Sequence, residues 1–130
     1  MALTRVEQLP PSIAQSRGKD WGLPERPADA IPITRPIRVL CESDRLTLLT
    51  HDPTQRPQVI RLGEQTQDGI DDLVAGVWEH TRQWGMAGRG LYWRPVLRFD
   101  VRPGGEQRFR ELEALLRDSG LPVQDGTVRR

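Results

Sequence analysis

The chain has 130 residues, a length typical of a single domain. It contains 19 Lys and Arg and 18 Asp and Glu, which gives a net charge of +1. Charge alone therefore does not indicate a nucleic acid or an anionic membrane as a binding partner. The one cysteine excludes an internal disulfide, and no apolar run approaches the ~20 residues that span a bilayer. We expect a soluble domain that does not insert into a membrane. It would be cytoplasmic as given, or periplasmic as part of an anchored parent.

The first 35 residues are rich in proline, arginine and polar side chains. Proline lacks a backbone N–H and disfavours both helix interiors and central strands. The composition therefore predicts an extended arm or linker over residues 1–35, with Trp21 as an anchor onto the domain that follows. Five prolines fall in this stretch: Pro10, Pro11, Pro24, Pro27 and Pro32.

Residues 36–62 carry the pattern of three strands. Ile37, Val39 and Cys41 alternate with other side chains, which is the period of a half-buried strand. Polar turn residues at 42–45 lead into a second strand over 46–50, and the two strands predict a hairpin. After a loop over 51–57, the third strand is short.

The next stretch predicts an amphipathic helix that buries one face. Thr66 or Asp68 would cap its start, and Gly85 would end it. We expect the two tryptophans of the apolar stripe to pack in the core rather than to bind a ligand. The stripe consists of Ile70, Leu73, Val74, Val77, Trp78, Thr81 and Trp84.

Residues 91–101 form the most regular strand pattern, with the odd-numbered side chains apolar and facing a core. A second helix follows, with Phe109 and Leu112 turned inward and Gly120 at its end. Residues 122–124 have room for a last strand, and residues 125–130 form a flexible tail. This strand–helix–strand unit predicts two parallel strands joined by a right-handed crossover.

The resulting order, β-β-β-α-β-α-β, predicts an α+β domain over residues 36–124. The expected architecture is a two-layer sandwich with a mixed sheet and both helices on one face. The other sheet face would be open to solvent or to a partner. The candidate interaction surface consists of Arg38, Tyr92, Arg94, Arg98 and Asp100, with Trp21 from the arm.

Two interpretations of this surface stay open. The first is a protein-interaction or assembly module that binds a protein partner or a second copy of itself as a homodimer. The alternative is nucleic-acid binding, in which arginines contact phosphates and the tyrosine stacks on a base. Tyr92 and the arginines on the same strand face motivate the alternative.

No arrangement of residues predicts an enzyme, a cofactor or a metal site. Cys41 could meet only His51 or His80 as a base, and its place in an apolar strand predicts a buried structural thiol. A zinc site would need several cysteine or histidine ligands at short spacing. We expect both histidines to be solvated and Asp100 to join Arg94 and Arg98 in an ion network on the strand face.

Several short segments of the sequence resemble those of a known family. They are PIRVLCESDRLTLLT at residues 36–50, WRPVL at 93–97, VRPGG at 101–105 and LLRDSGL at 115–121. Over about residues 36–124 the order of elements is similar to the periplasmic domain of ExbD/TolR-type proteins and of uncharacterised bacterial proteins built alike. The resemblance implies a soluble domain that dimerises and couples an ion-driven membrane motor to a partner. The membrane helix of that family is absent from these residues, so no functional residue is carried over.

Overall fold

The structure is a computed structural model that describes residues 9–24, 29–50 and 52–126, so His51 lies outside it. The sheet contains five strands in the order β3-β2-β1-β4-β5. Their bounds are β1 Ile31–Cys41, β2 Arg45–Leu48, β3 Gln58–Arg61, β4 Leu91–Val101 and β5 Val123–Asp125. The helices are α1 Ala14–Arg17, the short 3-10 turn η1 Thr66–Gly69, α2 Ile70–Arg82 and α3 Glu106–Leu115.

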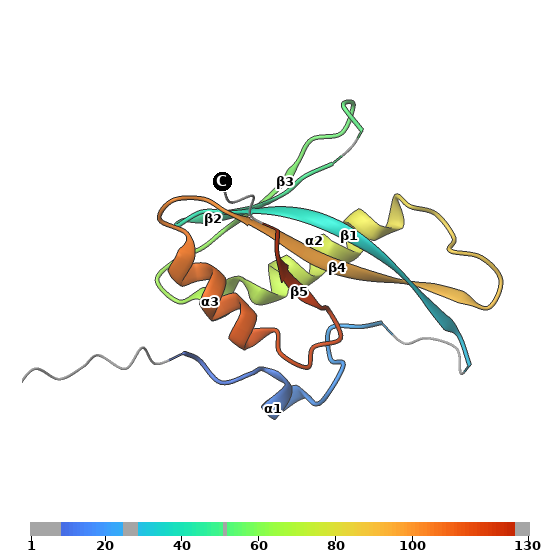
Figure 1. Cartoon of the computed structure of the whole chain (residues 1–130), viewed down its shortest axis with the longest axis horizontal. Coiled ribbons are helices and arrows are strands. Elements are labelled where there is room, and N and C mark those ends of the chain that lie inside the picture. Colours follow the sequence, from blue (N-terminus) through green and yellow to red (C-terminus); the bar gives the residue numbers. More distant parts are fainter. Residues whose placement is uncertain (1–8, 25–28, 51, 127–130) are drawn as a thin grey trace, which may run out of the picture.

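The sheet is mixed and open, and the predicted α+β class is confirmed. β2 pairs antiparallel with both β1 and β3, whereas β4 pairs parallel with both β1 and β5. The parallel pairing of β4 with β5 is the one that the last strand–helix–strand unit predicts. Figure 1 shows β1 and β4 side by side along the molecule, with the β2–β3 hairpin projecting beyond them.

The odd-numbered residues of β1 and β4 share one phase, and Ile37, Val39, Cys41, Leu97 and Phe99 among them face the helices and form the core. Phe99 is fully buried and tilts against Phe109 of α3, with 5.5 Å between the ring centroids. Because α2 and α3 contribute to one cluster, they cover the same sheet face, as predicted. Burial of each such side chain stabilises the fold by roughly 1.5–3 kcal/mol. The cluster includes Ile37, Val39, Leu97 and Phe99 from the strands and Leu73, Val77, Leu112 and Leu115 from the helices.

The two prolines of β1 lie where a missing N–H leaves no gap in the ladder. The Ile31 N–H donates to the Gly90 carbonyl at 2.9 Å, so odd-numbered residues of β1 bond to β4 and even-numbered ones point the other way. Pro32 and Pro36 are even-numbered and precede Val39, where pairing with β2 begins. Their nitrogens therefore face an unpaired edge, where proline is tolerated and blocks further pairing. For this reason β1 begins at Ile31, before the start near Pro36 that the proline content predicts.

Pro95 of β4 also lies where its nitrogen has no neighbouring strand, on the opposite side of the β1–β4 pair. The Leu97 N–H donates to the Pro122 carbonyl at 2.8 Å where pairing with β5 begins, so odd-numbered residues of β4 bond toward β5. Pro95 has this parity and lies before that pairing starts. Its nitrogen also faces an edge without a partner strand.

Residues 12–23 run across the helical layer and join α2 to α3. Ile13 is buried in the core, and its N–H donates to the Leu115 carbonyl at 3.1 Å. The Trp78 indole N–H donates to the Gly22 carbonyl at 2.7 Å. Part of the predicted arm thus packs on the domain through the side chains and backbone of this segment.

The start of α2 differs from the prediction. Neither Thr66 nor Asp68 caps it, because η1 intervenes and no side chain bonds to the first-turn N–H groups. The buried Thr66 hydroxyl instead donates to Glu111 Oε1 at 2.7 Å and accepts from Arg108 Nη1 at 2.8 Å. Arg108 also donates from Nε to the Ser43 carbonyl at 2.9 Å, which ties α3 to the turn between β1 and β2.

Replacing Gly105 with alanine should destabilise the protein by about 1–3 kcal/mol, the usual cost of overpacking a buried site. A Cβ built at Gly105 would lie 2.3 Å from the Cys41 carbonyl oxygen, a backbone atom that side-chain rotation cannot move. The control is Gly63→Ala, since a Cβ there meets nothing within 4 Å. Urea denaturation followed by circular dichroism measures both variants, and equal midpoints would contradict the close approach.

Candidate functional site

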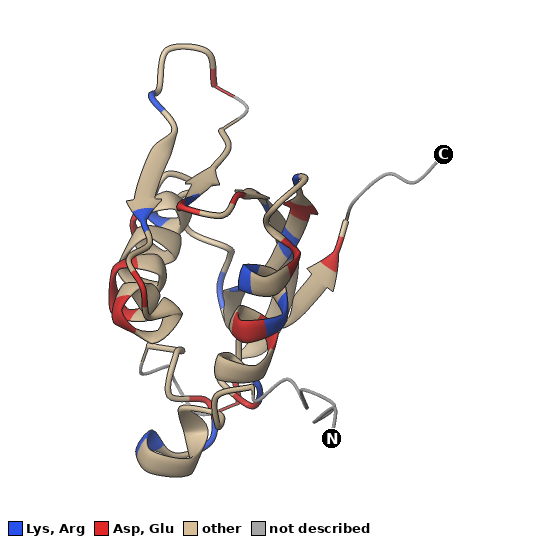
Figure 2. Cartoon of the chain, turned by 90° about the vertical axis from the view of Figure 1, so that its left-hand side faces the viewer, with Lys and Arg blue, Asp and Glu red and all other residues tan. Residues whose placement is uncertain are grey.

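The outward face of the sheet carries most of the predicted candidate residues. It is the face opposite α2 and α3, and in the described residues no helix packs on it. Figure 2 shows basic and acidic residues spread over both the strands and the helices. The outward side chains of β1 to β4 in this region are Pro36, Arg38, Leu40, Thr47, Val59, Val96, Arg98 and Asp100.

Arg38 and Arg98 lie directly beside each other at the centre of this face. They are register partners in the parallel β1–β4 pair, where neighbouring strands lie about 4.8 Å apart. Both side chains are exposed, and neither makes an ion pair with a described residue. Like charges opposite each other in a sheet are destabilising. No ion pair with a described residue compensates these two positive charges, which an anionic group would therefore stabilise.

A second pair of arginines lies at the hairpin end of the same face. Arg45 and Arg61 are register partners across β2 and β3. Arg45 Nε lies 3.1 Å from Asp44 Oδ1, and this hydrogen bond lowers the pKa of the Asp44 carboxyl, with a smaller contribution from Arg61. Arg61 is exposed and forms no ion pair within the described ranges. We call Arg38, Arg45, Arg61 and Arg98 the arginine face.

Asp100 does not neutralise the arginine face. It is register partner of Leu40 and half-buried, and its Oδ2 lies 3.9 Å from Arg102 Nη1, at the limit of an ion pair. Among the described residues, no ion pair joins it to Arg94 or Arg98, so the expected ion network is not formed.

Arg94 and Tyr92, although on the same strand, are not free groups of the arginine face. The Arg94 guanidinium turns toward the loop between α3 and β5, where Nε donates to the Gly120 carbonyl at 3.2 Å. Tyr92 is half-buried beside Pro32, near the far end of the β1–β4 pair. Neither side chain is presented flat on the centre of the open sheet.

Trp21 lies on the helical side and packs against the core, which is the anchoring role that the sequence predicts for it. The Arg17 guanidinium covers its ring at 5.0 Å from the centroid, and the same guanidinium donates to both carboxylate oxygens of Asp71 at 2.7 and 3.2 Å. The buried Trp21 indole nitrogen has no hydrogen-bond partner among the described residues. Trp21 is thus separated from the arginine face by the sheet itself.

An aromatic cluster surrounds Arg35, a residue that was not predicted to be part of a site. Its guanidinium lies 4.5 Å from the Trp84 ring centroid and 5.8 Å from that of Trp93, which is cation–π geometry. His80, which we expected to be solvated, is half-buried against Trp84, at 5.7 Å between ring centroids. The sequence does contain an indication of this cluster, because Arg35 has the same strand parity as the core residue Ile37. The predicted arm included residue 35, so this parity was not applied to Arg35.

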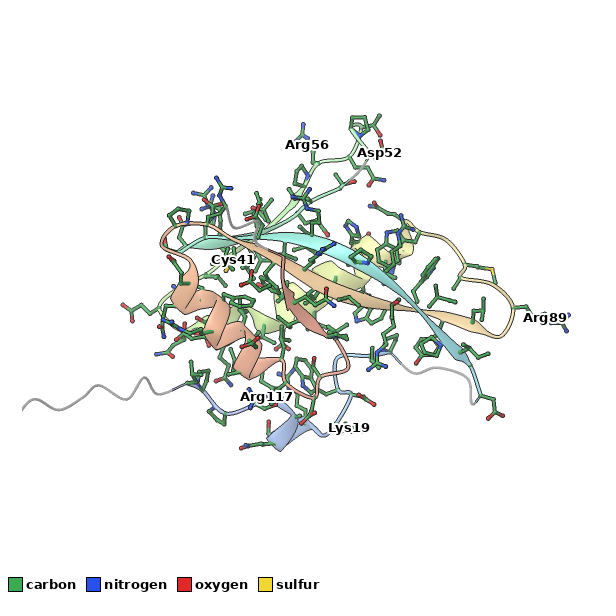
Figure 3. The ribbon with its side chains drawn as sticks, in the orientation of Figure 1. Lys19, Cys41, Asp52, Arg56, Arg89 and Arg117 are labelled. Atoms are coloured by element: carbon green, nitrogen blue, oxygen red, sulfur yellow. The ribbon has the colours of Figure 1, made fainter. Side chains whose placement is uncertain are left out.

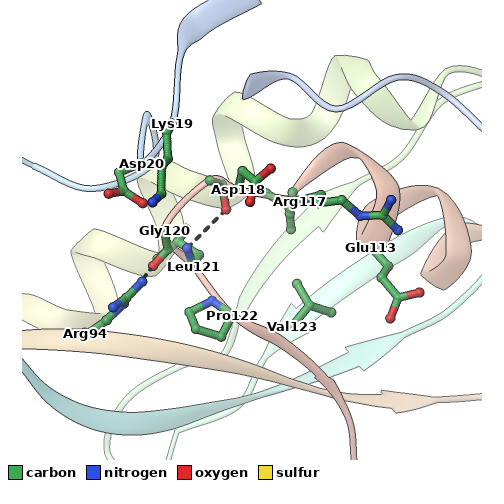
Figure 4. A pocket seen from close by; sticks show the side chains of 12 residues that line it. Lys19, Asp20, Arg94, Glu113, Arg117, Asp118, Gly120, Leu121, Pro122 and Val123 are labelled. Carbon is green, nitrogen blue, oxygen red and sulfur yellow. Dashed lines mark hydrogen bonds between the residues drawn. The ribbon is translucent and has the colours of Figure 1, made fainter. Parts of the chain in front are cut away.

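A shallow basin of about 520 Å³ lies between α3, β5 and the N-terminal segment (Figure 4). Arg94 borders it but is already bonded to the Gly120 carbonyl. Acidic and basic groups alternate around the rim, so the basin does not select an anion or a cation by charge. Its charged residues are Lys19, Asp20, Arg94, Glu113, Arg117 and Asp118.

Cys41 is fully buried and its thiol donates to the Gly105 carbonyl at 3.5 Å. Burial raises the pKa of the Cys41 thiol to about 12. Figure 3 places Cys41 within the body of the molecule, whereas Arg56 and Arg89 extend from loops. In the described parts of the chain, no three His, Cys, Asp or Glu residues cluster as metal ligands, and no helix is long and apolar enough to cross a membrane.

Fold and surface together define an α+β domain with a mixed open sheet and helices on one face. On the other face Arg38, Arg61 and Arg98 make no ion pair with a described residue. No protein-family model, curated protein or solved structure matches the chain.

Cys41 should not react with a thiol reagent such as DTNB in the native protein at pH 8, because burial and the raised pKa keep the thiol protonated and inaccessible. Labelling in increasing urea should follow the unfolding curve. Since the folded pKa lies above the ordinary value of 9.0, the thiol's contribution to stability is present below about pH 9 and is lost as the pH rises toward 12. Rapid stoichiometric labelling without urea would refute this burial.

Proposed function

We propose that this protein is a non-enzymatic interaction module that binds an acidic surface of a partner protein through the arginine face. The observation that carries the proposal is the register pairing of Arg38 with Arg98, two exposed guanidinium groups without an ion-pair partner among the described residues. Arginine forms bidentate hydrogen bonds to carboxylates and is enriched at protein interfaces.

The surroundings of the two arginines fit a protein partner. Leu40 and Val96 are half-buried side chains on the same outward face, in register positions next to the arginines. Thr47 follows in the row beyond Leu40. An apolar and polar mixture around charged anchors is the usual composition of a protein–protein interface.

Assembly in a membrane complex is part of this proposal. The order of hairpin, helix, strand, helix and strand is what the chain has in common with ExbD/TolR-type periplasmic domains, and in that family the soluble domain dimerises and contacts a partner. On this basis the protein acts as a soluble assembly domain of an ExbD/TolR-like complex, and a second copy of the chain is one candidate partner.

Nucleic-acid binding is the second candidate, because unpaired arginines also bind phosphates. Arg38, Arg61 and Arg98 supply three such groups on one face. The stacking platform that single-stranded nucleic acids use needs exposed aromatic rings, and Tyr92 is half-buried. Protein binding is therefore the better-supported function.

A photoreactive amino acid at position 47, next to the arginine face, should form one dominant protein adduct in the native host. The combined Arg38→Ala and Arg98→Ala substitution should reduce its yield about tenfold, since losing anchor contacts costs more than 1 kcal/mol. Both arginines are exposed, so the double variant should fold normally, and circular dichroism checks this.

The matched control places the same photoreactive group at position 113, an exposed residue of α3 on the helical side. The same adduct from both positions, or no adduct from position 47, would contradict the proposal. An adduct from position 47 that nuclease removes would favour nucleic-acid binding instead. Gel retardation of oligonucleotides at low salt provides the independent check.

A further inference from the structure

In the part of the chain that the structure describes, no segment pairs with the outer edge of β3. β3 is the end strand of the sheet, and the Leu62 N–H donates to the Asp44 carbonyl at 2.8 Å. Bonded pairs alternate in an antiparallel ladder, so Ile60 is bonded to β2 in the same way. The N–H and C=O groups of Val59 and Arg61 therefore point away from the sheet.

The edge of β3 contains no proline, unlike the unpaired stretches of β1 and β4. Pro32 and Pro36 of β1 and Pro95 of β4 each remove one outward N–H group where those strands lack a neighbour. The outward positions of β3 are Val59 and Arg61, which keep their N–H groups. An unprotected edge with free donors and acceptors is the template for adding a strand.

A groove of about 410 Å³ runs between the β3 edge and α2. A Cβ added to Gly76 would lie 3.6 Å from Ile60 Cδ1, an ordinary contact distance, so packing permits an alanine there. Glycine within a helix is less stable than alanine, and at this position it keeps the groove open. The lining residues are Gln58, Val59, Ile60, Arg61, Asp72, Ala75, Gly76 and Glu79.

A buried acceptor in this groove lacks a donor. Gln58 Oε1 is buried and has no hydrogen-bond partner among the described residues. A buried polar atom without a partner destabilises the protein. Because the atom is buried, a donor group on a molecule lying in the groove would satisfy it only after the Gln58 side chain rotates.

The helix side of the groove is acidic. Asp72 and Glu79 are exposed residues about two turns apart on α2, with Ala75 and Gly76 between them. Glu79 is paired with Arg82 at 2.9 Å, whereas Asp72 makes no ion pair with a described residue. Arg61 lines the strand side of the groove, so the negative charge that favours a basic side chain is confined to the helix rim around Asp72.

We propose that β3 and α2 form a binding site for an extended, basic segment of a partner protein, which adds to the sheet as a new strand beside β3. Main-chain hydrogen bonds to Val59 and Arg61 would hold the segment, and a Lys or Arg side chain would meet Asp72. A second copy pairing through β3 would bring the two acidic helix rims together, so a basic partner segment is the occupant that the charges favour.

A phage library of random octapeptides, selected against the full chain, supplies the probe. Enriched sequences should carry Lys or Arg, and the most enriched one is synthesised with a fluorescent label for anisotropy. Val59→Pro should weaken its binding at least tenfold, because the substitution removes an outward N–H and leaves the ladder to β2 intact. On binding, hydrogen exchange at the Val59 and Arg61 amides should slow.

Matched variants separate the edge from other effects. Val59→Thr keeps the N–H and should bind within twofold of the wild type. Gly76→Ala fills the groove without clash and should weaken binding several-fold, and Asp72→Asn should do the same by removing the rim charge. The combined Arg38→Ala and Arg98→Ala variant should bind the peptide normally, which distinguishes this site from the arginine face.

Three outcomes would overturn the proposal. The first is a selection that returns no sequence or only acidic sequences. The second is a selected peptide that binds Val59→Pro as tightly as the wild type. The third is a dimer in light scattering that Val59→Pro converts to a monomer, which would assign the edge to a second copy of the chain.

Discussion

The pairing of β1 with β4 is the constraint on which the rest of the structure depends. The two strands of 11 residues each match along their whole length, and both helices pack on their odd-numbered side chains. Every other strand attaches to this pair, β2 with β3 on one side and β5 on the other. The same register sets the even-numbered side chains on the opposite face, so the pairing that builds the core also places Arg38 beside Arg98.

Periodicity predicted the parts of the fold in which one face is buried. The alternation in residues 91–101 and the stripe of α2 gave the correct elements and the correct inward faces, because burial imposes the patterns that the sequence displays. The first half of β1 was missed, since Pro32 and Pro36 are unfavourable in a strand unless the direction of each nitrogen is known. That direction depends on which strands are neighbours, and a single sequence does not give them.

Only part of the geometry of the candidate surface was predicted, because a single sequence does not show which strands are neighbours. Strand parity correctly placed Arg38 and Arg98 on one face, but it could not show that they are register partners. Nor could it show that Arg94 turns to the Gly120 carbonyl, because that acceptor lies in a loop distant in sequence. No sequence pattern predicts the groove beside Val59, because α2 forms one of its walls and the edge strand β3 forms the other. The two proposed surfaces are thus products of tertiary arrangement, one across strands and one between a strand and a helix.

The long parallel pair also fixes the order in which the chain can fold during synthesis. Ile31 pairs with Leu91, 60 residues later, so the central strand leaves the ribosome well before its partner exists. Non-local parallel pairing is slow, and an unpaired apolar strand is prone to aggregate in the interval. Pro32 and Pro36 interrupt the free edge of that strand, and they therefore protect the nascent chain at the stage when it is most exposed.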